Sequence, residues 1–81
     1  MLFAFLTKRK MRKVLEAADG GILSAKEIAS RARVSESKTM EMLRHLETTG
    51  YLVSGYLMPV GLKIYRVTLQ GQDALAKDAA I

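Results

Sequence analysis

The side chains whose types and spacing could do chemistry lie in one segment, residues 35–50. With the helical period of about 3.6, its apolar side chains share one face. The opposite face gathers hydrogen-bond donors and acceptors and one thioether: Ser37, Lys38, Met40, Glu41 and Arg44. A short polar link at residues 33–35 separates this segment from an earlier helical pattern. Two short helices joined in this way can place the second one in the major groove of DNA, where its side chains meet base edges.

The remaining composition argues against catalysis and metal binding. The chain has no cysteine and a single histidine, His45, and it contains no glycine-rich phosphate loop and no cluster of carboxylates. We therefore expect no enzyme activity, no cofactor and no metal site. The lack of cysteine fits a reducing, cytoplasmic location. The opening MLFAFL is too short for a membrane span and has its charges on the wrong side for a signal peptide.

The charge of the chain favours an anionic partner. Lysine and arginine total 13 against 8 acidic residues, a net charge of +5. Residues 1–18 hold Lys8, Arg9, Lys10, Arg12 and Lys13 against Glu16 alone, a local charge of 5 − 1 = +4. Nucleic acid is the commonest partner of such a basic excess. Of this run, Arg9, Arg12 and Lys13 fall roughly together, and Arg9 and Arg12 are candidates for phosphate contact, although a solvated helix face is the alternative.

The elements that would position these side chains form one domain, because 81 residues cannot fill two cores. Ser24 and Glu27 form a capping-box pattern at the start of one helix, and Gly50 suits the end of the next. Ile22–Leu23 could form a short extended piece. The predicted elements are an apolar extension at 1–7, helices at 8–19, 24–32 and 35–49, a hairpin at 51–67 and a last helix at 69–80. The fold class is α+β, mostly α.

The apolar side chains of the N-terminus need a partner surface. A dimer contact with the last helix would cover them, and the alternative is that they complete the core of the monomer. The residues of the expected dimer contact are Leu2, Phe3, Phe5, Leu6 and Leu75.

The order of these elements and several local motifs resemble one large group of proteins. Gly50 follows Ser35 by fifteen residues, Tyr65-Arg66-Val67-Thr68 leads into the last helix, and Gly71 comes three residues later. In this the chain resembles the winged helix-turn-helix transcriptional regulators of the MarR, ArsR and PadR types, over about residues 8–78. The resemblance implies a three-helix core, a hairpin wing and binding of operator DNA as a homodimer.

Carried over by position, the resemblance also implies roles for the side chains of residues 35–44. Lys38 or Arg44 could donate to guanine, and Glu41 could accept from cytosine or form a local salt bridge instead. Ser37 could reach a base edge or a phosphate, and Met40 could touch a thymine methyl group. The backbone amides that follow Ser35 could hold a phosphate.

The expected wing departs from the pattern of these regulators, whose wing tips carry arginine or lysine. Here the tip, residues 56–60, is uncharged, and the nearest cations are Lys63 and Arg66, which we take as candidate DNA contacts. Such a tip could insert between bases, pack on the domain itself or contact a protein. The alternative function is therefore a protein-interaction module that uses the apolar wing and the N-terminus.

Overall fold

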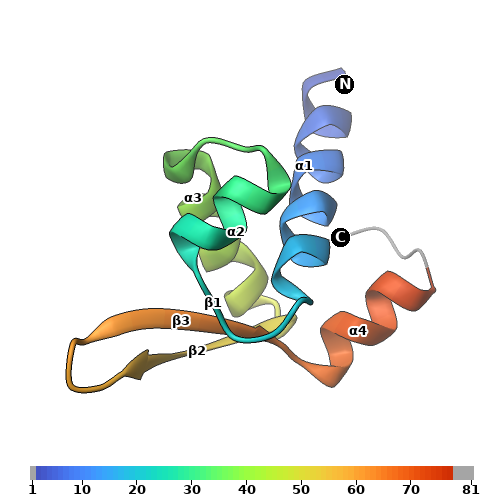
Figure 1. The fold of residues 1–81 in the computed structure, drawn as a ribbon. Coiled ribbons are helices and arrows are strands. Elements are labelled where there is room, and N and C mark those ends of the chain that lie inside the picture. Colours follow the sequence, from blue (N-terminus) through green and yellow to red (C-terminus); the bar gives the residue numbers. More distant parts are fainter. Residues whose placement is uncertain (1, 78–81) are drawn as a thin grey trace.

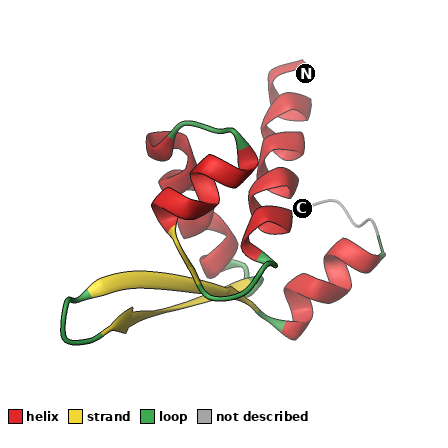
Figure 2. Cartoon of the chain, in the orientation of Figure 1, coloured by secondary structure: helices red, strands yellow, loops and turns green. Residues whose placement is uncertain are grey.

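The structure, a computed structural model, describes the backbone of residues 2–77 and the side chains of residues 8–77. Helices make up most of the described chain, and a small antiparallel sheet completes it (Figures 1 and 2). The mostly helical α+β class is therefore confirmed. The elements in chain order are α1 (Leu2–Ala18), β1 (Leu23–Ser24), α2 (Ala25–Ala32), α3 (Glu36–Thr48), β2 (Leu52–Leu57), β3 (Leu62–Val67) and α4 (Leu69–Ala76).

The first helix is longer than the sequence pattern indicated. Helix α1 is continuous from Leu2 to Ala18, so residues 2–7 are not the separate extension that we expected. Its predicted start at residue 8 is wrong because residues 2–7 contain neither glycine nor proline, and nothing there stops a helix from continuing. The helix ends before Gly20 and Gly21, and Gly21 has a φ of 137°, which favours glycine.

Two N-caps and a left-handed residue set the geometry of the helix pair α2–α3. The capping box of Ser24 is complete: its hydroxyl accepts from the Glu27 amide at 3.3 Å, and its own amide donates to the Glu27 carboxylate at 3.1 Å. Arg33 ends α2 in the left-handed conformation, with φ 58°. Ser35 then caps α3 by accepting from the Lys38 amide at 3.3 Å, so Ser35 precedes the helix that we predicted to include it. At the other end Gly50, with φ 88°, turns the chain into β2.

The sheet has the strand order β1-β3-β2, with β3 in the middle. Strands β2 and β3 pair without interruption from Leu52↔Val67 to Leu57↔Leu62. Strand β1 adds only two residues, and it lies one position later than the extended piece that we expected. Figure 1 shows the β2–β3 hairpin projecting away from α1 and α4.

Only one face of the sheet belongs to the hydrophobic core. Leu52, Tyr65 and Val67 are buried together with side chains of α1, α2 and α3. On the other face Val53 and Leu62 are 43% and 45% exposed. Since successive side chains of a strand point to opposite faces, the strand register separates the two sets cleanly. We call the exposed side the outer face of the sheet.

Helix α4 is held to the start of the hairpin by its cap. The Thr68 hydroxyl accepts from the Gly71 amide at 3.1 Å and donates to the Gly50 carbonyl at 2.7 Å. Gly71 is buried so close to the Tyr51 carbonyl that a side chain would overlap it. The described helix ends at Ala76, earlier than the predicted residue 80, and residues 78–80 lie outside the described part of the chain.

Candidate nucleic-acid interface

Helix α3 has one buried face and one fully exposed face. Thr39, Met42, Leu43 and Leu46 are buried in the domain. The five side chains that the sequence pattern placed on the opposite side are all exposed, namely Ser37, Lys38, Met40, Glu41 and Arg44. Met40 is unusual there, because it is a large apolar side chain with 53% of its surface exposed. The structure therefore brings these five residues together on one accessible surface.

The side chains of this surface have no partners within the domain. Among the described residues, no hydrogen bond or ion pair engages the side chains of Ser37, Lys38, Glu41 or Arg44. In particular, Glu41 does not form the local salt bridge that its helical spacing allowed. Polar groups that are not used inside the domain remain available to an external ligand such as a base edge or a phosphate.

The charge of the α3 surface is balanced. Glu36 and Glu41 offset Lys38 and Arg44, so this helix supplies no net attraction for phosphate. The nearest additional cation along the chain is Arg33, which is exposed in the turn just before the cap of α3. Our sequence analysis did not select Arg33. Its position in the short polar link at residues 33–35 was the signal that could have identified it.

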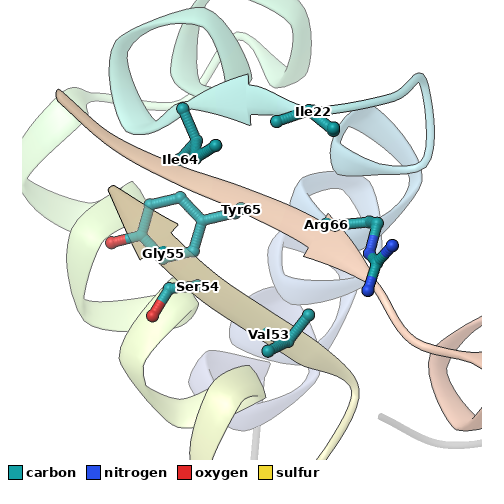
Figure 3. Close-up of a pocket in the computed structure, with 7 residues that line it drawn as sticks. All are labelled: Ile22, Val53, Ser54, Gly55, Ile64, Tyr65 and Arg66. Atoms are coloured by element: carbon teal, nitrogen blue, oxygen red, sulfur yellow. The ribbon is translucent and has the colours of Figure 1, made fainter. Parts of the chain in front are cut away.

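The two wing cations lie on opposite faces of strand β3. Lys63 shares the side of Tyr65, with its ammonium 5.6 Å from the centre of that ring. Arg66 lies on the outer face, beside Ile22 and Val53 (Figure 3). Helix α3 packs against the other face of the sheet, so the structure does not bring Arg66 to the α3 surface. Lys63 and Arg66 were both selected as DNA contacts, but they are three positions apart and therefore lie on opposite faces, because only alternate residues of a strand share a face.

The tip of the hairpin is exposed. Tyr56, Met58 and Val60 are 64%, 72% and 76% accessible. The tip therefore does not pack on the domain itself, which was one of the three possibilities that the sequence left open.

The basic residues of α1 lie away from the α3 surface. The Arg12 guanidinium donates to the Leu75 carbonyl of α4 at 3.0 Å and pairs with Glu16 at 3.0 Å. Arg12 therefore has a structural role between two helices. Arg9 is exposed, on a helix that Figure 1 shows on the side opposite the hairpin.

The expected dimer contact divides into two parts. Leu75 is half-buried and packs against the core of its own chain, and its part in a dimer contact stays a prediction. The side chains of Leu2, Phe3, Phe5 and Leu6 lie outside the described residues.

Comparison with solved structures identifies the architecture. The transcriptional regulator BldR from Sulfolobus solfataricus superposes with a TM-score of 0.76 at 20% identity, covering 85% of this chain and 50% of that one. The reduced form of the transcriptional regulator YodB from B. subtilis gives 0.76 at 25% identity, covering 95% and 78%. A MarR family transcriptional regulator from Silicibacter pomeroyi gives 0.70 at 18% identity, covering 83% and 44%. The chain has the winged helix-turn-helix fold.

The resemblance read from the sequence is thereby confirmed at the level of the fold. This winged helix spans about half the length of several of the proteins that it matches. The sequence matches no protein-family model and no curated protein.

Two further findings concern the described part of the winged helix. No group of three or more histidine, cysteine or acidic side chains there is arranged to hold a metal ion. None of the described helices combines the length and the apolar character that crossing a membrane requires.

Proposed function

We propose that this winged helix binds double-stranded DNA sequence-specifically and acts as a small transcriptional regulator in the cytoplasm. The observation that carries the proposal is the α3 surface, a row of exposed side chains without partners on a helix that begins directly after a tight turn. A helix in this setting fits the major groove. The similar solved structures named above are those of transcriptional regulators, which supports the same function.

Base recognition would come from α3. Arg44 and Lys38 can donate to the O6 and N7 atoms of guanine, and Glu41 can accept from the N4 amino group of cytosine. Ser37 and Met40 would add a polar contact and an apolar contact to a thymine methyl group. A good bidentate contact discriminates by about 1–3 kcal/mol against the wrong base.

Phosphate binding would come from positions around α3. The amides that follow Ser35 point out of the helix start, and Arg33 and Lys63 add positive charge from the turn and the hairpin. If about three phosphates are neutralised, the logarithm of the affinity should fall with the logarithm of the salt concentration with a slope near −3. Arg9 would contribute little, because α1 lies on the other side of the domain.

Selection of bound sequences from random duplexes tests the proposal. The wild-type chain should enrich a defined motif, and the double variant Lys38→Ala, Arg44→Ala should lose discrimination at one or two base positions. Lys77→Ala is the matched control, because Lys77 is exposed on α4 and pairs with Asp73 at 3.3 Å. Unchanged enrichment by the double variant would refute the role of α3.

We further propose that the protein acts as a homodimer. Figure 1 shows the first turns of α1 rising beyond the other helices, and their sequence contains Leu2, Phe3, Phe5 and Leu6. Selected sites should then contain two inverted half-sites about 10 base pairs apart, centre to centre. Sedimentation equilibrium should show a dimer in the absence of DNA. A monomer that selects single half-sites would refute this part.

The exposed apolar tip of the wing supports a second candidate function, contact with another protein. Met58 and Val60 are among the most exposed apolar side chains of the domain, and the tip has no charge that would attract phosphate. Retention on duplex DNA at moderate salt discriminates between the two candidates. A chain that passes through such a column would favour the protein contact.

A further inference from the structure

Strand β2 forms an open edge of the sheet. Strand β3 lies between the other two strands, so β2 has a partner on one side only. Within the described part of the chain, Figure 1 shows no helix or strand along its free side. An open edge presents unpaired amides and carbonyls, which another extended chain can pair with.

The strand register identifies which groups of β2 point outward. The Thr68 amide donates to the Tyr51 carbonyl at 3.0 Å, and these residues continue the register of the β2–β3 ladder. In an antiparallel ladder, hydrogen-bonded and non-bonded pairs alternate. The amides and carbonyls of Leu52, Ser54 and Tyr56 therefore face away from β3, toward the open side.

This edge lacks the features that usually prevent pairing. Natural edge strands carry lysine, proline, a bulge or an inward-pointing charge. The β2 sequence LVSGYL has no charged residue and no proline, and its pairing with β3 is uninterrupted. The edge is therefore chemically open to a further strand.

Next to this edge, the outer face carries a shallow pocket of about 220 Å³ (Figure 3). Ile22, Val53 and Ile64 supply apolar walls, and Gly55 leaves a gap because a Cβ there would meet no atom within 4 Å. At one end lies Arg66, directly opposite Val53 in the ladder. Among the described residues, no hydrogen bond, ion pair or ring contact engages the guanidinium of Arg66.

We propose that the β2 edge binds an extended apolar peptide segment of another protein, antiparallel to β2, with a carboxylate near the peptide's carboxyl end. The backbone of the peptide pairs with Leu52, Ser54 and Tyr56. Its alternate side chains lie over the pocket at Gly55. Its carboxylate meets Arg66, which fixes the direction, because Arg66 lies at the end where β2 begins.

The charge of the pocket favours a peptide over a second copy of this chain. A second copy would add its own β2, which has no carboxylate to offer Arg66. The proposal rests on the second candidate function, contact with another protein, and names the kind of segment that would be bound. It does not depend on DNA binding, because the pocket is on the face of the sheet opposite α3.

The test uses the whole chain, labelled with ¹⁵N, and a synthetic peptide of alternating threonine and valine with a free terminal carboxylate. We expect saturable binding below about 1 mM, a weak but specific affinity. The amide signals of Leu52, Ser54 and Tyr56 should shift most. The same peptide with an amidated carboxyl end should bind about tenfold more weakly, because a charge-assisted hydrogen bond is lost.

Three variants separate the parts of the proposal. Arg66→Gln should weaken binding of the free-acid peptide about tenfold and leave the amidated peptide unaffected. Arg31→Gln makes the same change at an exposed residue of α2 and should alter the affinity for neither peptide. Tyr56→Pro removes one outward amide without removing a β2–β3 hydrogen bond, so it should weaken both peptides while the spectrum shows an intact hairpin.

Several outcomes would overturn the proposal. These are the absence of saturable binding, equal affinity for the free-acid and amidated peptides, and shifts confined to α3. Concentration-dependent shifts at β2 without peptide would instead show that a second copy occupies the edge. Measuring duplex DNA retention of Arg66→Gln in parallel distinguishes failure of this proposal from failure of DNA binding.

Discussion

Replacing Gly71 with alanine should destabilise the domain, although alanine is the better helix former. Helix propensity alone favours Gly71→Ala by about 1 kcal/mol. The new Cβ, however, would overlap the Tyr51 carbonyl and lie 2.8 Å from Cγ1 of Val67. The Tyr51 oxygen is backbone and cannot rotate away, so α4 must shift and strain its Thr68 cap. Overpacking of this kind costs about 3 kcal/mol, which leaves a net loss of about 2 kcal/mol.

Thermal unfolding measured by circular dichroism tests this reasoning. For a domain of this size, 2 kcal/mol corresponds to a fall of about 10 °C in Tm. Gly55→Ala is the matched control, because its Cβ would meet no atom within 4 Å and its backbone is ordinary strand. It should change the stability by less than about 0.5 kcal/mol or raise it slightly. Equal melting temperatures for Gly71→Ala and Gly55→Ala would refute the idea that the nearby Tyr51 carbonyl requires a glycine at position 71.

Three further changes test other contacts of the domain. The Thr39 hydroxyl is buried without a hydrogen-bond partner among the described residues, so Thr39→Val should be neutral or stabilise by about 1 kcal/mol in urea unfolding. Arg12→Met should cost about 1 kcal/mol by removing the bond to the Leu75 carbonyl, while DNA affinity stays the same. Hydrogen bonds from the backbone and side chain of Ser24 hold the pKa of Glu27 below its ordinary value of 4.5. Its ionised form therefore stabilises the domain at neutral pH, and this contribution is lost as the pH falls through the lowered pKa. The urea midpoints of wild type and Glu27→Gln should differ above about pH 5 and converge at lower pH.

Local sequence signals predicted the helix-turn-helix segment and the hairpin well. The Ser24–Glu27 capping box and the Gly50 helix end both depend on residues within one or two turns of each other. Such signals are read directly from the chain. The division of α3 into a buried and an exposed face also follows from its own periodicity. These features therefore required no knowledge of the tertiary structure.

The contacts that the sequence did not predict join segments that are distant along the chain. Nothing near Arg12 in the sequence shows that a carbonyl of Leu75 lies within hydrogen-bond distance. The burial of Leu75 against its own core depends on how α4 returns to α1, which the turn at Thr68 determines. The start of α1 was misplaced for a different reason: the change from apolar to basic residues near position 8 suggested a boundary, whereas composition alone does not end a helix.

The sequence predicted the hairpin itself, but we did not use its strand alternation to assign Lys63 and Arg66 to different faces. Alternation along β3 already places Lys63 and Arg66 on opposite faces of the sheet. Lys63 lies on the side of the sheet that faces the core and α3, whereas Arg66 lies on the uncovered side with Val53 and Ile64. A wing built in this way offers two chemically different surfaces. If both proposals hold, DNA is bound on the side near α3 and an extended chain with a carboxylate is bound on the outer face, so the two partners do not compete for one surface.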